Sequence, residues 1–413
     1  MIRIGNASGF YGDRFAAVRE MLEGGELDVL TGDYLAELTM LILGRDRAKD
    51  ANLGYARTFL RQLEDCLGLA LEKGVKIVSN AGGLNPAGLA VAIDKLGLGA
   101  QVAWVTGDDV RSRFPDALTA NAYLGAWGIA RCLESGADVV VTGRVTDASL
   151  VVGPAAAHFG WSRDDWDALA GATVAGHVLE CGTQATGGNY SFFSEIDVSR
   201  PGFPIAEVHA DGSSVITKHD GTGGAVTVDT VTAQLLYEIG APAYPGPDVV
   251  SHFDTIRLDP HERGVRISEV RGSAPPDTLK VCLNYLGGFR NSTTFVLCGL
   301  DIEAKADLVR RQLESALGSD GLTWTLARTE HVDADTEEAA SALLHVTVKT
   351  TDPQRAKAFS RAGIELALGS YPGFHVTAPP GDGTPFGVYK PAYVPRDSVA
   401  HQAILPGGEV VGV

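Results

Sequence analysis

The stretch Ile77-Val78-Ser79-Asn80-Ala81-Gly82-Gly83 decides the fold class, because a short apolar run ends there in small and polar residues. The same pattern recurs along the first third of the chain, at residues 3–9, 29–33, 77–83, 104–108 and 139–144. Short continuous apolar runs are typical of strands buried on both faces of a parallel sheet. The carboxyl ends of such strands share one edge, where ligands bind. We therefore expect these ends to form the edge of an active site.

Helical patterns separate the predicted strands, at residues 15–23, 34–43, 56–73, 84–96 and 121–134. Within the third pattern, apolar residues recur at three- and four-residue spacing, as in Phe59, Leu63, Cys66 and Ala70. Alternating strands and helices predict right-handed crossovers. Residues 1–170 are therefore expected to form an α/β domain with a Rossmann-like, mostly parallel sheet and helices on both of its faces.

The amino-acid composition of the chain changes after about residue 170. Residues 171–290 are rich in Gly and Thr and are expected to form a β-containing module that completes the site. Residues 291–377 follow the order strand, helix, strand, strand, helix, strand, which predicts a ferredoxin-like βαββαβ unit. Residues 378–413 are rich in Pro and Gly and are expected to be a C-terminal arm that packs on another domain or subunit. A homo-oligomer is expected on this basis.

Composition excludes several classes of protein. The chain has 413 residues, of which 45% are hydrophobic, and no apolar run approaches the roughly 18 residues that span a bilayer. The formal net charge of -17 opposes binding to nucleic acid. The sequence opens into a predicted strand without a signal peptide, and its five cysteines form no CxxC pair. We expect a cytoplasmic protein with reduced thiols and no membrane partner.

Four charged residues follow the predicted strands and are candidates for catalysis: Asp33, Asp108, Arg144 and Asp147. An Asp just beyond a strand can act as a general base, bind a metal or contact a substrate hydroxyl. It can equally cap the next helix, which is the commoner role in an α/β protein. Arg144 would suit a carboxylate or another anion through two parallel hydrogen bonds.

Two glycine-containing turns are candidates for substrate binding. The first contributes Asn6, Ser8 and Gly9, and the second contributes Asn80, Gly82, Gly83 and Asn85. Backbone N–H groups in such turns can bind an anion or form an oxyanion hole for a polarised carbonyl. The alternative is a tightly packed turn between a strand and a helix, with Pro86 in the first turn of that helix.

The segment from His177 to Tyr190 is the densest run of reactive side chains. Cys181 is a candidate nucleophile or proton donor at the end of a predicted helix, although a single cysteine is more often a small buried apolar residue. His177 and Glu180 lie one helical turn apart, so they can form an acid–base pair or share a metal. The glycine-rich loop that follows adds three candidate binding residues, Gly187, Gly188 and Asn189.

A later polar segment contains His209 and Asp211, which with His219 could hold a divalent metal. The alternative is a polar hairpin that turns at Asp211 and Gly212. Lys218, Thr222 and Gly223 could instead bind a phosphate. The sequence has neither the GxGxxG pattern of NAD sites nor the GxxxxGK[ST] pattern of ATP sites. The cofactor is therefore unknown, and a divalent metal remains open.

Several long motifs together resemble the acyclic terpene utilisation family, AtuA-type. They lie at residues 3–13, 28–37, 79–86, 141–147, 182–190, 218–224 and 279–290. The resemblance implies a bacterial component of citronellol and geraniol breakdown that is encoded beside acyl-CoA enzymes. It also implies lyase action on a branched 3-hydroxyglutaryl-CoA. Longer relatives carry an additional ferredoxin-like unit, so a small partner protein of that fold is a further expectation.

Residues and resemblance together predict an enzyme that acts on an acyl-CoA or a related carboxylate. The reaction expected first is a lyase reaction, either carbon–carbon cleavage or hydration and dehydration. A retro-aldol cleavage needs a base, for which Asp33, Asp108 and His209 are candidates, and an electrophile such as Arg144 or the turn at residues 80–83. Cys181 would return a proton to the product. One alternative is a non-catalytic subunit or scaffold that binds an acyl ligand. Another is a thioester hydrolase that uses Cys181.

Overall fold

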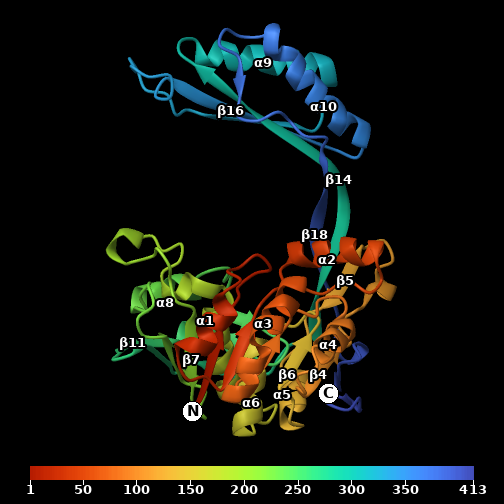
Figure 1. Cartoon of the computed structure of the whole chain (residues 1–413), viewed down its shortest axis with the longest axis vertical. Helices are drawn as coiled ribbons and strands as arrows, with labels where there is room; N and C mark the ends of the chain where they lie inside the picture. Colours follow the sequence, from red (N-terminus) through yellow and green to blue (C-terminus); the bar gives the residue numbers. More distant parts are fainter. The chain divides into compact units, whose positions relative to one another are not determined.

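The computed structural model describes all residues, 1–413, and divides them into two compact units (Figure 1). Unit 1 contains residues 1–284 and 389–413, and unit 2 contains residues 285–388. Residues 171–284 share unit 1 with residues 1–170, so the expected separate module is part of the first unit. Most of the expected C-terminal arm also belongs to unit 1.

The centre of unit 1 is a set of five parallel strands in the order β1-β2-β3-β6-β4. Their bounds are β1 (Ile2–Asn6), β2 (Val29–Gly32), β3 (Lys76–Ser79), β6 (Val139–Thr142) and β4 (Val102–Thr106). These are the five apolar runs of the sequence, and the shared strand direction places all of their carboxyl ends at one edge. The prediction of a common edge is confirmed.

Antiparallel strands extend this centre on both sides into a sheet of 11 strands. On the β1 side lie β7 (Pro204–Val208), β8 (Ser214–Lys218), β12 (Gly264–Ser268) and β11 (Arg257–His261), and on the β4 side lie β19 (Gln402–Ile404) and β20 (Val410–Gly412). The expected mostly parallel sheet is therefore correct only for the centre. Hairpins such as β7–β8 need only a short turn, whereas parallel pairing requires a crossover helix.

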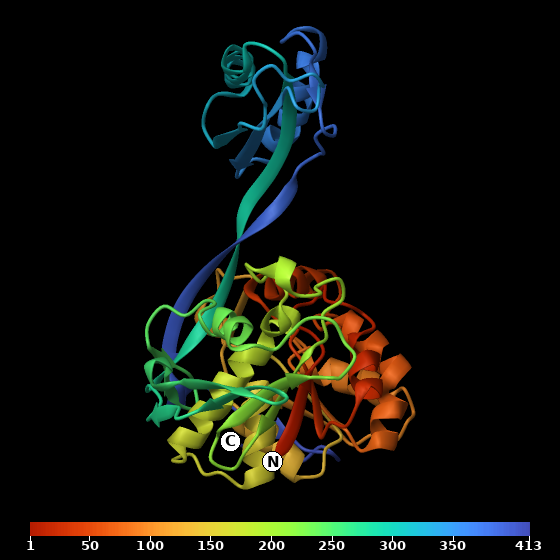
Figure 2. The same ribbon diagram turned by 90° about the vertical axis from the view of Figure 1, so that its left-hand side faces the viewer.

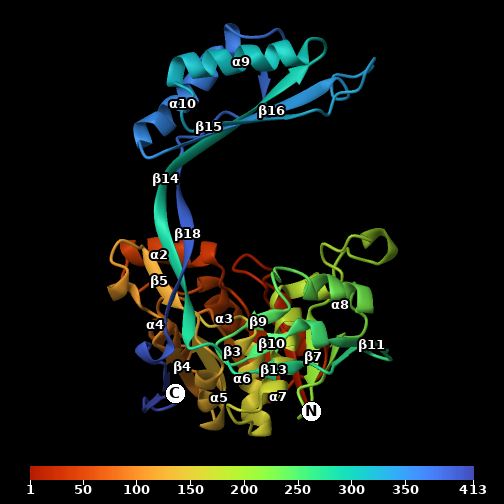
Figure 3. The same cartoon turned by 180° about the vertical axis from the view of Figure 1, so that it is seen from behind.

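Helices cover both faces of the unit 1 sheet (Figures 1 and 3). One face carries α1 (Ala17–Gly24), α3 (Arg57–Lys73) and α4 (Pro86–Asp94), and the other carries α5 (Trp127–Glu134), α6 (Ser149–Phe159) and α7 (Trp166–Glu180). Phe59, Leu63 and Leu67 of α3 are buried in one core cluster with Ile77 and Val139 of the sheet. This burial is what the three- and four-residue spacing predicted.

Further elements of unit 1 are α2 (Glu37–Lys49), α8 (Val228–Leu235), β5 (Thr119–Ala122) and a small sheet. That sheet contains β9 (Ala243–Pro245), β10 (Val250–His252) and β13 (Arg271–Ser273). The helix predicted over residues 121–134 begins only at Trp127. Residues 119–122 are instead extended, because they pair with β14 (Thr278–Cys298). Long-range pairing overrides local helical spacing here.

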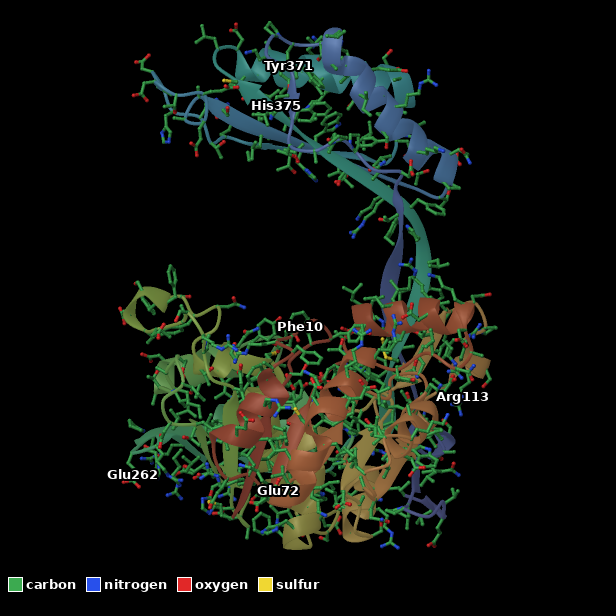
Figure 4. All side chains as sticks on the ribbon, viewed as in Figure 1. Phe10, Glu72, Arg113, Glu262, Tyr371 and His375 are labelled. Carbon is green, nitrogen blue, oxygen red and sulfur yellow. The ribbon has the colours of Figure 1, made fainter.

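Unit 2 contains the second half of β14, then α9 (Ile302–Leu317), β15 (Leu322–Ala327), β16 (Ser341–Thr350), α10 (Pro353–Glu365) and β17 (His375–Val376). Its sheet has the order β15-β16-β14-β17, and β18 (Thr384–Pro395) also pairs with β14 (Figure 2). Phe295, Val346 and Phe359 are fully buried between sheet and helices. The hydroxyl of Tyr371, labelled in Figure 4, donates to the Val296 carbonyl at 2.9 Å.

Gly107, just after β4, provides a test of close backbone packing in unit 1. It has a φ of +110°, and a Cβ atom there would lie 1.8 Å from the Ala400 carbonyl oxygen. We expect Gly107→Ala to lower the free energy of unfolding by about 3 kcal/mol, because a forced backbone shift adds to an unfavourable φ. Urea denaturation measures this change.

Gly97→Ala is the matched control for that substitution. Gly97 also has a left-handed φ, of +71°, but a Cβ atom there would meet nothing within 4 Å. It should cost only about 1 kcal/mol, the cost of the conformation itself. Equal losses in the two variants would show that the contact with Ala400 contributes nothing.

Candidate active site

A cavity of about 500 Å³ opens in unit 1 at the carboxyl edge of the parallel strands. Its lining comes from the loops after β1, β2 and β6, the end of α7 and the glycine-rich loop that follows it. Phe10, labelled in Figure 4, belongs to the first of these loops. The volume lies within the range of small-molecule sites.

Four of the six predicted catalytic residues line this cavity: Asp33, Arg144, Asp147 and Cys181. Asp33 and Arg144 are almost completely buried, with 4% and 3% of their surface exposed. The sequence placed these residues at three different positions along the chain, and the fold brings them to one cavity. Gly9, Gly188 and Asn189, which were predicted to bind substrate, also line it.

Arg144 is held rigidly at the centre of this group. Its Nη1 atom donates to Asp147 Oδ1 at 2.7 Å and to the Leu35 carbonyl at 3.2 Å. Its guanidinium carbon lies 4.4 Å from the centre of the Tyr123 ring, in the range of a cation–π contact. The buried Nε atom has no hydrogen-bond partner. A buried guanidinium in this setting is a fixed positive charge beside the cavity.

Asp33 is oriented by its neighbours. Asn80 Nδ2 and the Leu35 N–H both donate to Asp33 Oδ1, at 2.6 and 3.1 Å, and no hydrogen bond ends on Oδ2. Burial raises the pKa of Asp33 well above its usual value, and the Asp147 charge raises it further, although Arg144 and Asn80 oppose the change. This environment therefore favours the protonated form of Asp33, which can donate a proton or a hydrogen bond.

Asp147 has different properties from Asp33. Burial raises its pKa to about 6, and the adjacent Arg144 limits the rise. At neutral pH the Asp147 carboxylate is ionised and sits close to the pKa that suits a general base. The cavity thus holds two aspartates whose pKa values are both raised by burial, although their charged neighbours differ.

His177 and Glu180 form the pair expected from their spacing on α7. His177 Nδ1 and Glu180 Oε1 are 2.8 Å apart, and Glu180 lines the cavity. Burial alone would lower the pKa of His177, but the Glu180 carboxylate reverses the effect and the pKa is raised. The Glu180 carboxylate therefore favours the protonated form of His177.

Cys181 lines the cavity as a neutral thiol. Burial and the neighbouring Glu180 charge raise its pKa to about 12. A nucleophilic cysteine needs a lowered pKa, so this environment does not favour the thioester hydrolase hypothesis. A neutral thiol can still donate a proton.

Three residues that were predicted to bind substrate instead form hydrogen bonds next to the cavity, outside its lining. Asn6 Nδ2 donates to the Leu179 carbonyl at 2.6 Å, and Ser8 Oγ donates to the Phe10 carbonyl at 3.0 Å. Asn80 orients Asp33. These three side chains are buried and do not line the cavity. They fix the ends of β1, β2 and β3 instead.

The turn at Gly82 and Gly83 does not form the expected oxyanion hole. A Cβ atom on Gly82 would lie 2.4 Å from the Thr142 carbonyl oxygen, and one on Gly83 would lie 2.4 Å from Leu43 Cδ1. The Gly83 N–H donates to the Asn80 carbonyl. Asn85 caps α4 by accepting from the Gly88 N–H at 2.9 Å. The tightly packed turn, the alternative interpretation of the sequence, is therefore correct.

Asp108 is buried behind Arg144 and does not line the cavity. Its Oδ2 atom accepts from the Arg144 N–H at 2.9 Å and from Asn121 Nδ2 at 2.7 Å. A Cβ atom on Gly143 would lie 2.5 Å from Asp108 Oδ1, so the carboxylate packs tightly into this turn. Asp108 holds the backbone that carries Arg144.

Asp108 also provides a test of pH-dependent stability. Burial raises its pKa to about 6 from an ordinary value of 3.8. A raised native pKa contributes stability that is fully present below pH 3.8 and is lost as the pH rises through about 6. Asp108→Asn should remove about 3 kcal/mol of this pH dependence, since one pKa unit equals about 1.4 kcal/mol. Urea denaturation at pH 4 and pH 7 measures the free energy of unfolding at each pH. If the difference between the two pH values were the same in the native chain and in Asp108→Asn, the raised pKa of Asp108 would be contradicted.

The residues of the later polar segment lie away from the cavity. His209 is exposed in the turn between β7 and β8, and β7 runs antiparallel to β1. This topology puts His209 at the opposite edge of the sheet, so it does not belong to this cavity. Its Asp211 neighbour forms the predicted turn through Ser213. His219 is buried and contacts the Met21 carbonyl at 2.9 Å.

The proposed phosphate loop is likewise separate from the cavity. Lys218 Nζ donates to the Thr222 carbonyl at 2.7 Å, and Gly223 lies against the Arg200 carbonyl. Gly187 also lies outside the lining, against Ile196. No three His, Cys, Asp or Glu side chains in the chain are grouped to hold a metal ion, so the expected His209–Asp211–His219 set is not assembled.

Glu37 and Tyr123 are two residues of this region that were not predicted from the sequence. Glu37 lines the cavity and accepts a hydrogen bond from the Tyr123 hydroxyl at 2.8 Å. Burial would raise the pKa of Glu37, but hydrogen bonds and the Arg144 charge leave it lowered. Glu37 opens α2 directly after the Asp33 loop, which is the signal that could have indicated it. Tyr123 carried no such signal, because it follows a strand that only pairing with β14 reveals.

The chain has little similarity to curated proteins or to solved structures. A search of curated proteins gives no match to the chain. One solved structure, described as a putative PII-like signaling protein from Thermus thermophilus, is 19% identical and covers 27% of this chain and 94% of that chain. Its TM-score of 0.15 is too low to support an argument. No helix of the chain combines the length and the apolar character needed to cross a membrane.

The family comparison covers nearly the whole chain. The model of the acyclic terpene utilisation family protein AtuA matches residues 2–405. The match includes both units and every residue of the cavity. This protein belongs to the acyclic terpene utilisation family AtuA.

Proposed function

We propose that the chain is a lyase of acyclic terpene or branched-acid catabolism that acts on an acyl-CoA or a related carboxylate. One observation carries the proposal. Arg144 forms an ion pair with Asp147 in a cavity that is also lined by Asp33, whose pKa is raised by burial. A base, an acid and a fixed cation at one place are the groups that a carbon–carbon or carbon–oxygen cleavage beside a carbonyl requires.

In a retro-aldol cleavage, Asp147 takes the proton of the substrate hydroxyl. The O–H electron pair forms a new carbonyl, the adjacent carbon–carbon bond breaks, and its electron pair moves to the thioester or carboxylate oxygen as an enolate. Arg144 and the neutral Asp33 stabilise that oxygen. The enolate carbon then takes a proton from the Cys181 thiol, and the proton held by Asp147 restores the thiol. Elimination of water would use the same base and cation, with Asp33 protonating the departing hydroxide.

The carboxylates of the cavity decide how an anionic substrate can bind. Six acidic side chains line it, namely Asp13, Asp33, Glu37, Asp147, Glu180 and Glu238, against the single cation Arg144. Burial raises the pKa of Asp33, Asp147 pairs with the Arg144 guanidinium, Glu180 contacts His177, and Asp13 accepts from the Gly9 N–H at 2.8 Å. These contacts reduce the negative field, so the reacting end of a substrate, a thioester carbonyl or a single carboxylate, fits this cavity better than several anionic groups do.

The second candidate is a non-catalytic acyl-ligand-binding or scaffold subunit. Unit 2 favours it: we interpret its β15-β16-β14-β17 sheet with α9 and α10 as a ferredoxin-like unit, a fold suited to assembly. Residues such as Leu300 and Leu368 expose most of their side chains. A small ferredoxin-fold partner, a homo-oligomer and a cytoplasmic location all remain predictions from the sequence.

Turnover by the purified full chain separates the two candidates. The substrates are 3-hydroxyglutaryl-CoA, its 3-methyl analogue and 3-hydroxybutanoyl-CoA, with products followed by mass spectrometry. A lyase should release acetyl-CoA or an unsaturated acyl-CoA from at least one of them. Binding of all three without product would support the scaffold and reject the lyase. Addition of a chelator tests a metal requirement in the same assay.

A further inference from the structure

A second cavity of about 450 Å³ lies in unit 1 next to the candidate active site. Asp147 lines both cavities. The two have opposite characters, because seven of the twelve residues that line the second cavity are Tyr, Pro or Leu. Asp147 is the only acidic residue in its lining, whereas the first cavity has six. The first cavity is thus lined mainly by charged groups, and the second mainly by apolar and aromatic groups.

The wall between the cavities is a contact between Arg144 and Tyr123. Arg144 lines the first cavity and Tyr123 lines the second, with the guanidinium carbon 4.4 Å from the centre of the Tyr123 ring. The Tyr123 hydroxyl donates to Glu37, which lines the first cavity. A molecule held at Asp147 would therefore have a polar end beside Arg144 and an apolar face beside the Tyr123 ring.

The apolar wall is contributed by segments far apart in the sequence. Tyr244, Pro245 and Pro247 follow α8, whereas Pro276 immediately precedes β14 and Leu279 is its second residue. Rigid prolines and tyrosine rings give large contact area at low conformational cost. The single cation of this lining, Lys280, lies 5.2 Å from the Tyr123 ring centre, so its charge is directed to the ring. One such lysine does not make a phosphate site.

We infer that this second cavity binds the aliphatic chain of a substrate whose polar, reacting end lies at Asp147 and Arg144. The inference rests on the proposed function, and it adds the substrate class: an elongated molecule with an anionic or carbonyl head and an apolar tail. Each methylene that leaves water adds about 0.8 kcal/mol of binding free energy, or up to about fourfold in affinity. Chain length should therefore control affinity.

The test is calorimetric titration of the full chain with butanoate and octanoate. Octanoate should bind at least tenfold more tightly than butanoate, because its four additional methylenes enter the second cavity. Thr278→Trp places a large ring at an exposed position in the lining of that cavity. It should weaken octanoate binding at least tenfold and butanoate binding less than twofold.

Asp277→Trp is the matched control, since Asp277 is an exposed neighbour that does not line the cavity. It should leave both affinities unchanged, and thermal melting confirms that both variants are folded. Equal affinity of the native chain for the two acids would overturn the chain-binding inference while leaving the proposed function intact. Equal weakening of both acids by Thr278→Trp would do the same. Absence of any binding would overturn both.

Discussion

Asp147→Asn should lower kcat by about 10²- to 10⁴-fold on whichever substrate the native chain cleaves, the range expected for loss of a general base. The amide keeps the shape of the side chain and can still accept from Arg144, but it cannot take a proton. The native enzyme should also lose activity tenfold per pH unit as the pH falls through about 6, the pKa to which burial raises Asp147. Steady-state rates between pH 4.5 and 9 measure both effects.

The fall in rate at alkaline pH should depend on the ionisation of Asp33. The pKa of Asp33 is raised well above its usual value by burial, and its proton is needed for the acid role. The native profile should therefore be bell-shaped, and Asp33→Asn should remove its alkaline limb. Asp164→Asn, at an exposed position outside the cavity, is the control and should keep the native profile. An acid limb that persists in Asp147→Asn at the same pH would contradict the assignment of the base.

Arg144→Met should have the largest effect on stability and activity together. The substitution removes a cation that is 3% exposed and leaves Asp147 without its ion-pair partner. Breaking a buried pair on one side costs about 3 kcal/mol or more, measured by urea denaturation at pH 7. The Arg144 charge also limits the rise of the pKa of Asp147. The acid limb of the residual activity should therefore move above pH 6.

A conservative variant shows whether charge or geometry matters at position 144, and a surface variant is its control. Arg144→Lys keeps the charge but not the planar fork that contacts Asp147, Leu35 and the Tyr123 ring, so we expect an intermediate loss of activity. Arg45→Met removes an exposed arginine of α2 and should change neither stability nor activity. A native acid limb in Arg144→Met would show that Arg144 does not act on Asp147.

The parallel centre of unit 1 could be predicted because each of its strands carries its own local signal. Apolar runs such as Ile77–Ser79 end in small polar residues, and the helices between them have regular spacing. The antiparallel flanks were harder to predict. Strand β19, for example, has only three residues. It pairs with β4, which lies about 300 residues earlier in the sequence. Local propensity contains no information on such pairing.

The candidate site was predicted in part, for a related reason. Position after a parallel strand correctly indicated Asp33 and Arg144, but the same position indicated Asp108, which lies behind the cavity. Sequence position fixes the edge of the sheet but not the depth of a side chain within it. His209 was a candidate base from its residue type, but the antiparallel direction of β7 places it at the opposite edge of the sheet.

The sequence by itself determined the family, the five parallel strands, the shared edge at their carboxyl ends and the spacing of His177 and Glu180. These follow from local periodicity and from motifs that are contiguous in the chain. Only the tertiary structure decided which carboxyl groups have raised pKa values, which residues lie behind the cavity and that an apolar cavity adjoins a charged one. Burial and the distance between charges set these properties, and both arise from contacts between segments such as Tyr123, Arg144 and Leu279 that no local pattern connects.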